Sequence, residues 1–357
     1  MKRIVAFVFG FLFIFTGLTF SGCGELNDND NYNTGEQLTE YFDTSLPNGE
    51  ISFDNFVMRL TDFDRIIPLG QIHPPEHSFP TDHIYFVYNG INKPVYAPTS
   101  GKILYIGATN TYGDRAIRIG VTNTMAYYLD HIYITDGLKV GDTIQSGVQI
   151  GTSGNTPCVD FGVINKNVNN AFINQKYPVS TLYGDKPLYY YVEPLRAQLY
   201  AEVTPPQPID EPEYVYDEPV TDGKFVYDEA GTLLGNWILE ESLNENDRYE
   251  WADTLSFCYD CYYPTQIRIG SGQYGNAFAV SNDDNPTKPE NVSISSGAVA
   301  YYLFNGNNTN KGIPPTGTRT GLMMVQMLSD TRIQVEIFND TTSIRKDFTS
   351  ASLYYVR

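Results

Sequence analysis

Short runs of strand-forming residues, separated by turn residues, constrain the fold of this chain more than any other feature of its sequence. In the first half the runs cover residues 94–97, 101–107, 115–121, 126–132 and 160–164. In the second half they cover residues 224–227, 235–239, 266–269, 298–304, 321–327, 333–337 and 353–356. Gly, Asn, Asp and Pro separate the runs, as β-hairpins require, and long stretches of helical periodicity are absent. We therefore predict a mostly β protein built from antiparallel sheets.

A proline-rich and acidic segment divides the chain of 357 residues into two parts. Residues 204–218 contain the sequence Thr-Pro-Pro-Gln-Pro-Ile-Asp-Glu-Pro-Glu at their start, which excludes a helix or a central strand. We predict a first domain over residues 50–203 and a second β-rich domain, of sandwich or barrel type, over residues 219–357. The length agrees with two domains.

The N-terminus has the pattern of an exported lipoprotein. Lys2 and Arg3 precede an uncharged apolar run over residues 4–20, and small residues then stand before Cys23. This predicts a signal peptide at residues 1–22, with Cys23 as the lipid-bearing first residue after cleavage. The alternative is a single membrane-spanning anchor with an incidental cysteine, but the run is short for the ~20 residues of a spanning helix.

The residues after Cys23 predict a tether. Residues 23–49 are rich in Asn, Asp, Glu, Thr and Gly, so they contain too few apolar side chains to form a core. A random coil of this length reaches on the order of 30 Å. Gly24 rather than Asp follows the cysteine, which favours the outer membrane or the cell surface over retention in an inner membrane.

The charge of the chain excludes one class of partner. It has 42 acidic against 23 basic residues, a formal net charge of −19. Binding of nucleic acid phosphates needs a positively charged surface, so we expect no nucleic acid partner. We also expect that the protein contacts a membrane through its lipid anchor only.

All four histidines lie in the first domain, at positions 73, 77, 83 and 131. Histidine is the commonest metal ligand and the usual general base near neutral pH. His83 and His131 lie in strand-like stretches, whereas His73 and His77 lie in a proline-rich loop. This clustering predicts a functional site in the first domain, although a stabilising surface role is the default for one or two of these residues.

Residues 70–164 resemble the LytM or lysostaphin-type zinc endopeptidases, which cut peptide cross-bridges of bacterial cell walls. Pro-Val-Tyr-Ala-Pro-Thr-Ser-Gly-Lys-Ile at 94–103 is similar to the strand and turn that follow the family's first metal motif. Leu-Lys-Val-Gly-Asp-Thr-Ile-Gln-Ser-Gly-Val-Gln-Ile-Gly-Thr-Ser-Gly-Asn at 138–155 is similar to the family's glycine-punctuated hairpins. The resemblance implies an antiparallel β-sheet core, a zinc cofactor and peptidoglycan as the partner.

The family's catalytic positions map onto this chain with changes. His83 matches the first zinc-binding histidine, and Val87 stands where the family has a zinc-binding aspartate. His131 matches the isolated histidine that assists the attacking water. Cys158 and Asp160 stand where the family has the two histidines of its last motif, a catalytic partner and a zinc ligand.

This mapping supplies two zinc ligands, His83 and Asp160, whereas a catalytic zinc normally has three. His77, in the preceding loop, is the preferred third ligand. A different chemistry is a hydrolase in which His131 activates Cys158 as a nucleophile. The simpler alternative is that Cys158 is a small buried residue.

The second domain contains a further motif, Cys-Tyr-Asp-Cys at Cys258 and Cys261. A lone motif of this kind is a redox pair, half of a metal site or a local disulfide, and the disulfide is preferred for an exported protein. Trp237 and Trp251 are candidates for stacking on sugar rings, although core packing is the default role of such residues.

Three hypotheses for function follow. The first is an active zinc-dependent peptidoglycan endopeptidase using His83, Asp160 and a ligand from residues 73–82. The second is a pseudoenzyme that recognises wall peptides, or activates envelope amidases by docking. The replacements at positions 87, 158 and 160 favour the second. The third places the function in the C-terminal domain.

Overall fold

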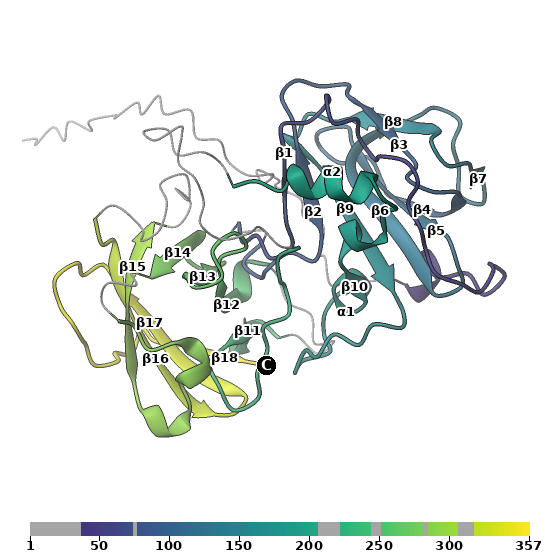
Figure 1. Ribbon diagram of the computed structural model, residues 1–357. Coiled ribbons are helices and arrows are strands. Elements are labelled where there is room, and N and C mark those ends of the chain that lie inside the picture. The colour runs from purple at the N-terminus through teal and green to yellow at the C-terminus, as the bar shows by residue number, and fades with distance from the viewer. Residues whose placement is uncertain (1–36, 74–76, 206–221, 244–250, 281–284, 306–317) are drawn as a thin grey trace, which may run out of the picture.

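The computed structural model describes residues 37–73, 77–205, 222–243, 251–280, 285–305 and 318–357. It consists of a ten-stranded sheet and a separate closed barrel, which lie beside each other in Figure 1. All pairings between these strands are antiparallel. The predicted fold class, mostly β with an antiparallel core sheet, is confirmed. Among the described residues, no helix combines the length and the apolar character needed to cross a membrane.

The first sheet has the strand order β1-β2-β9-β6-β5-β4-β7, while β10 pairs with β9, and β8 pairs with β3 and β6. Its strands are β1 (Arg65–Ile67), β2 (Ile84–Val87), β3 (Pro94–Tyr96), β4 (Gly101–Ile106), β5 (Arg115–Gly120), β6 (Met125–Ile134), β7 (Thr143–Ile144), β8 (Gln149–Ser153), β9 (Cys158–Asn165) and β10 (Gly184–Asp185). Its helices are η1 (Leu38–Glu40), α1 (Val179–Leu182), η2 (Pro187–Tyr190) and α2 (Leu195–Ala201).

One face of this sheet carries the apolar core, and alternation along the strands sends the neighbouring residues to the other face. Phe161 of β9 and Tyr127 of β6 are buried on the core face, where Phe53 and Tyr191 pack against them. Because successive strand residues point to opposite faces, the opposite face receives the residues between these core positions. On β9 that places Asp160 on the opposite face.

The barrel closes through eight strands in chain order. They are β11 (Gly235–Leu239), β12 (Thr254–Tyr259), β13 (Ile267–Ser271), β14 (Asn276–Val280), β15 (Val299–Asn305), β16 (Gly321–Ser329), β17 (Arg332–Phe338) and β18 (Leu353–Val356), and its short helices are η3 (Glu240–Ser242), η4 (Trp251–Asp253), η5 (Pro289–Asn291) and η6 (Ile294–Ser296). The second sheet is therefore a barrel and not a sandwich.

Buried side chains fill the barrel, as the small diameter of eight strands allows. Trp237, Phe257, Tyr301 and Met323 belong to one apolar cluster, and each is fully buried. Trp237 is 0% exposed, and its indole N–H donates to the Leu233 carbonyl at 2.9 Å, so its buried ring is not available to stack on a sugar.

Some strand predictions are wrong. Residues 224–227 form no strand, because Gly223 makes only an isolated bridge with Leu69 and the aromatic side chains that follow pack into clusters on two sides. The sequence patterns also missed β12 and β14. β12 is buried along five of its six residues, so it shows little of the alternation that identifies a half-buried strand.

The predicted tether over residues 23–49 also needs correction at its C-terminal end. Tyr41 is 1% exposed, and the Arg118 guanidinium lies 4.4 Å from its ring centroid. Lys102 forms a 2.7 Å ion pair with Asp43. Tyr41 and Phe42 pack in a cluster with Ala126 and Ile164, so this end of the polar stretch lies against the sheet. Residues 23–36 and the signal peptide, Cys23 included, lie outside the described residues.

The barrel contacts the first sheet through the segment that precedes β2. The Ser256 hydroxyl donates to the Ser78 carbonyl at 2.5 Å, and Trp251 packs against Phe79 with ring centroids 5.8 Å apart. The domain boundaries at 50–203 and 219–357 stay predictions, and most of the linker at 204–218 lies outside the described residues.

Candidate functional site

Three neighbouring strands in the middle of the first sheet position the predicted site residues. His83 immediately precedes β2, Asp160 lies on β9, and His131 lies on β6. Asp160 is in register with Tyr85 of β2 on one side and with Asp130 of β6 on the other. The side chains thus come together from three segments that are distant in the sequence.

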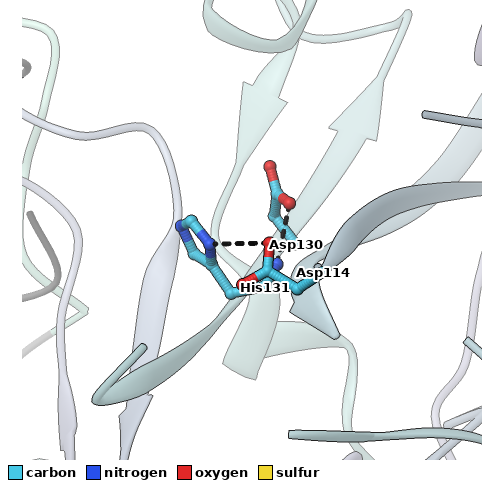
Figure 2. Close-up of side chains that lie close together, drawn as sticks. All are labelled: Asp114, Asp130 and His131. Atoms are coloured by element: carbon cyan, nitrogen blue, oxygen red, sulfur yellow. Dashed lines mark hydrogen bonds and ion pairs between the residues drawn. The ribbon is translucent and has the colours of Figure 1, made fainter. Parts of the chain in front are cut away.

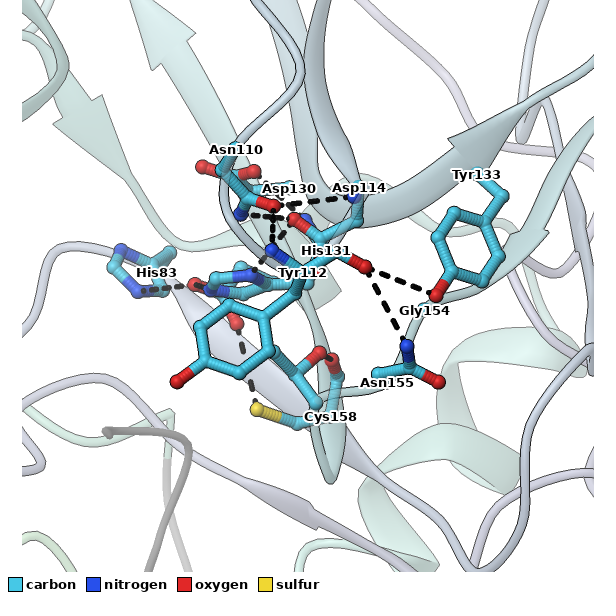
Figure 3. Close-up of polar contacts among 12 residues, drawn as sticks. His83, Asn110, Tyr112, Asp114, Asp130, His131, Tyr133, Gly154, Asn155 and Cys158 are labelled. Atoms are coloured by element: carbon cyan, nitrogen blue, oxygen red, sulfur yellow. Dashed lines mark hydrogen bonds and ion pairs between the residues drawn. The ribbon is translucent and has the colours of Figure 1, made fainter. Parts of the chain in front are cut away.

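These residues form a buried chain of alternating carboxylates and imidazoles, of which Figure 3 labels His83, His131 and Asp114. The His83 ring lies between two acids, with Nδ1 2.8 Å from Oδ1 of Asp82 and Nε2 3.2 Å from Oδ2 of Asp160. The His131 ring also lies between two acids, with Nε2 3.6 Å from the same Asp160 oxygen and Nδ1 3.6 Å from Oδ1 of Asp114. Asp160 therefore connects the two histidines.

Two hydroxyl groups hold the outer end of this chain in place. Tyr128 donates to Oδ1 of Asp82 at 3.1 Å, and Thr181 donates to its Oδ2 at 2.6 Å. Hydrogen bonds to a carboxylate favour its charged form. Together with His83 they lower the pKa of Asp82, although burial acts in the opposite direction.

The carboxylates determine the charge of both histidines. Burial by itself would lower the pKa of His83, but the negative charge of Asp160 and the hydrogen bond to Asp82 raise it to about 10. Burial by itself would also lower the pKa of His131, but the negative charges of Asp160 and Asp130 raise it to about 10. The two cations in turn lower the pKa of Asp160. Without a bound metal, both imidazoles are protonated near neutral pH.

A local irregularity brings His131 to the site. Its φ is +62°, in the left-handed region that residues other than glycine rarely adopt. The register between β5 and β6 also shifts here. Ile117 pairs with Leu129 and Arg115 pairs with Ile132, so β6 contains one more residue than β5 between these two pairs. Leu129 and Ile132 both belong to the core, so this bulge reverses the alternation and moves His131 off the core face.

Two acidic residues of the site were missed by the sequence analysis. Asp114 precedes β5 and is fully buried, and Asp130 adjoins His131 on β6. One ligand atom from each of Asp114, Asp130 and His131 lies within 4.8 Å of the others (Figure 2), the one group of three candidate metal ligands that the described residues contain. No sequence motif marks Asp114, because its proximity to His131 depends on the pairing of β5 with β6.

His77 lies at the edge of the site. Its ring centroid is 5.6 Å from that of His83 and 5.8 Å from that of Trp251 in the barrel. Burial, with a smaller effect of His83, lowers the pKa of His77 to about 3, so its imidazole is neutral. Among the described residues, His77, His83 and Asp160 do not gather their ligand atoms within 4.8 Å. His73 forms a backbone bridge with His77.

Cys158 is fully buried, and its sulfur lies 3.6 Å from Oδ1 of Asp160. Val87 is its register partner on β2, and both belong to an apolar cluster with Ile67 and Tyr85. Cys158 is disulfide-bonded in the structure and therefore has no thiol, which does not support the predicted pairing of Cys158 with His131 as a nucleophile and base.

The predicted disulfide between Cys258 and Cys261 is wrong, because both are free in the structure. Cys258 packs with Ile72 on one part of the interface with the first sheet, whereas Cys261 packs in the cluster that contains Cys158 and contacts the Gln71 amide oxygen at 3.2 Å. The two side chains belong to different clusters. Burial raises the pKa of Cys258 to about 12, which makes it an unreactive thiol.

Comparison with protein-family models identifies residues 85–171 as matching peptidase family M23. This confirms the resemblance to LytM and lysostaphin-type peptidases for that segment, which contains His131, Cys158 and Asp160. The family is one of metallopeptidases related to peptidoglycan. No curated protein matches the chain.

Several solved structures are similar to part of the chain. Csd3 of Helicobacter pylori is 18% identical over 40% of this chain and 35% of its own, with a TM-score of 0.29. A zinc-containing peptidase from Vibrio cholerae is 20% identical over 33% of this chain and 38% of its own, with a TM-score of 0.28. The catalytic domain of lysostaphin from Staphylococcus simulans is 21% identical over 34% of this chain and 87% of its own, with a TM-score of 0.27. The chain thus spans little more than a third of the first two proteins.

Proposed function

We propose that the first domain recognises peptidoglycan peptides in the cell envelope and lacks the zinc-dependent hydrolysis typical of its family. One observation carries this proposal. The carboxylate of Asp160 lies between the imidazoles of His83 and His131, at 3.2 Å and 3.6 Å. The side chains at the family's metal and catalytic positions therefore neutralise one another.

The donor set at the family's position does not fit a catalytic zinc. Two of the expected ligand atoms, on His83 and Asp160, are close together, but Val87 offers no donor and packs in an apolar cluster. His77 does not come within ligand distance of both. Because a catalytic zinc takes three protein ligands at ~2.0–2.2 Å, two ligands leave the site incomplete.

Access to the site also supports a role without catalysis. The side chains of His83, His131 and Asp160 are 10%, 7% and 7% exposed. His77 lies between His83 and Trp251 of the barrel, so the segment attached to the barrel covers this side of the site. A hydrolase must admit both a peptide and water to its reacting atoms.

A second candidate function is an active zinc-dependent endopeptidase that uses His83, Asp160 and His77. One observation favours it. Nε2 of His83 is buried and has no aligned hydrogen-bond partner among the described residues, as expected of an atom that awaits a metal. The neutral imidazole of His77 would then have to move toward His83 and Asp160 to complete the set.

A sedimentation and digestion assay with purified peptidoglycan separates the two functions. We expect the full chain, purified in detergent, to sediment with peptidoglycan and to generate no new peptide amino termini with or without added Zn²⁺. A variant combining Val87→Asp, Cys158→His and Asp160→His serves as the matched control, because it restores the family's donors on the adjacent strands β2 and β9, where Val87 is in register with Cys158.

The decisive outcome concerns the unmodified chain. Formation of new peptide amino termini that requires Zn²⁺ and disappears in His83→Ala would establish the endopeptidase instead. Failure to sediment with any wall preparation would remove the recognition function. Docking onto envelope amidases stays a prediction that the same preparation can test by co-purification.

We also propose that the protein acts in the cell envelope, attached to a membrane by a lipid. The N-terminal pattern at residues 1–23 supports export and lipid attachment at Cys23, on an outer membrane or the cell surface. An attachment there would keep the first domain close to the wall.

A further inference from the structure

We propose that Asp114, Asp130 and His131 bind one divalent transition-metal ion, such as Zn²⁺, beside the position where the M23 family holds its zinc. This site shares no proposed ligand with the pair His83 and Asp160. The proposed metal site does not depend on wall recognition, because it concerns an ion bound inside the first domain and not a reaction.

The three ligands are of the right kind and lie close together. Two carboxylates and an imidazole are donors that first-row divalent ions accept. One atom from each lies within 4.8 Å of the others, and Figure 2 shows the three side chains converging. Ligand atoms ~2.1 Å from a tetrahedral zinc are about 3.4 Å apart, so a small inward movement would complete the site.

Two buried atoms of this group have no hydrogen-bond partner among the described residues. They are Oδ2 of Asp114 and Nδ1 of His131, whose side chains are 0% and 7% exposed; the 3.6 Å ion pair between this Nδ1 and Oδ1 of Asp114 is too long for a hydrogen bond. A buried polar atom without a partner is costly, and native proteins rarely keep one without a reason. A metal ion would accept a lone pair from Oδ2 of Asp114 and, once the proton on Nδ1 is released to solvent, a lone pair from His131.

The backbone at His131 is arranged for this group. Adjacent residues of an extended strand point to opposite faces, so Asp130 and His131 could not normally share a ligand. The left-handed φ of +62° at His131 breaks the alternation and places both side chains beside Asp114. Strained backbone of this kind is concentrated at functional sites.

Asp114 is also held so that one oxygen remains available. Asn110 accepts hydrogen bonds from the backbone N–H groups of Tyr112 and Asp114 at 2.9 Å and 3.1 Å, and its amide donates to Oδ1 of Asp114. Oδ2 then faces Gly154, where a Cβ atom would lie 2.8 Å from it. Only glycine leaves this side of Asp114 unobstructed.

The other nitrogen of His131 faces Asp160 at 3.6 Å. A carboxylate in this position is the usual neighbour of a metal-binding histidine, because it keeps the proton on the nitrogen that does not bind the metal. Asp160 would then hold the proton on Nε2 and leave Nδ1 for the ion. The competing occupant of Nδ1 is a proton, in which case the group is an ion pair without metal.

Cobalt binding tests the proposal on the full chain, purified in detergent and stripped with EDTA. We expect Co²⁺ to bind with a stoichiometry of one and to produce visible absorption bands, and Zn²⁺ to displace it. Asp114→Asn and Asp130→Asn, which keep the side-chain shape, should each weaken binding at least tenfold. Asp136→Asn is the matched control, because Asp136 is exposed just beyond β6.

Two outcomes would overturn the proposal. One is that neither ion binds to protein whose circular dichroism shows the β fold, which would mean that a proton occupies Nδ1. The other is that His83→Ala abolishes binding while Asp114→Asn and Asp130→Asn retain it, which would place the ion at the family's position. Peptidoglycan sedimentation of the same samples reports separately on the proposed function.

Discussion

At the scale of single residues, charge compensation dominates the site. Asp160 is 5% exposed and shares its charge between two imidazoles, each of which has a second carboxylate on its other nitrogen. Removing one member of a buried ionic group leaves its partners without compensation, at a cost of about 3–5 kcal/mol. The same group is therefore both a candidate site and a determinant of stability.

The pH dependence of stability follows from these pKa shifts. The raised pKa values of His83 and His131 stabilise the fold fully below about pH 6.5, and this contribution is lost as the pH rises through about 10. The lowered pKa of Asp160 adds stability above its ordinary value of 3.8, and that contribution is lost on acidification. The site should thus stabilise the protein most between these limits.

We predict that Asp160→Asn lowers the free energy of unfolding by about 3–5 kcal/mol at pH 7 and by much less at pH 10.5, where the histidines of the unmodified chain are also neutral. Urea unfolding in EDTA, followed by circular dichroism, measures this. Asp136→Asn, an exposed carboxylate, should stay within about 0.5 kcal/mol. An equal loss at both pH values would mean that packing, and not charge, explains the effect.

At the scale of elements, a cross-strand contact between β6 and β9 supports the site. Gly162 is in register with Tyr128, whose ring lies over it and whose hydroxyl reaches Asp82 at 3.1 Å. A Cβ atom at position 162 would lie 2.1 Å from this ring. The glycine therefore permits a hydrogen bond two strands away.

We predict that Gly162→Ala destabilises the protein by about 1–3 kcal/mol, because the Tyr128 ring must move and Asp82 loses a donor. Thermal and urea unfolding measure the loss. Gly107→Ala is the matched control, since the nearest atom to its Cβ would be 3.4 Å away, and we expect a change of about 0.5 kcal/mol or less. Equal stability of the two variants would show that the ring relocates without cost.

At the scale of the whole molecule, the two parts of the chain share an interface next to the site. Ser256 and Trp251 of the barrel contact Ser78 and Phe79, which lead into β2. The barrel therefore bears directly on the segment that carries His77. Lipid attachment would add a second connection, from the first domain to a membrane.

We predict that Cys23→Ala moves the chain from the membrane fraction to the soluble fraction of the expressing bacterium and abolishes labelling with a fatty acid, since an acyl chain supplies ~0.8 kcal/mol of membrane affinity per buried CH₂. Cys258→Ala, which alters a buried cysteine of the barrel, should leave both unchanged. A Cys23→Ala chain that remains in the membrane with residues 1–22 attached would instead support a spanning anchor.

The sequence by itself determined the fold class, most strands and the meeting of His83, His131 and Asp160, because strand alternation and the M23 pattern are local properties of the chain. Only the tertiary structure decided that Asp114 and Asp130 join them, since this requires the pairing of β5 with β6 and a left-handed residue within a strand. It also decided that Cys258 and Cys261 stay apart and that the second sheet closes into a barrel. Spacing along a chain states which residues are near in sequence, whereas the direction of each side chain depends on dihedral angles and on strand partners far along the chain.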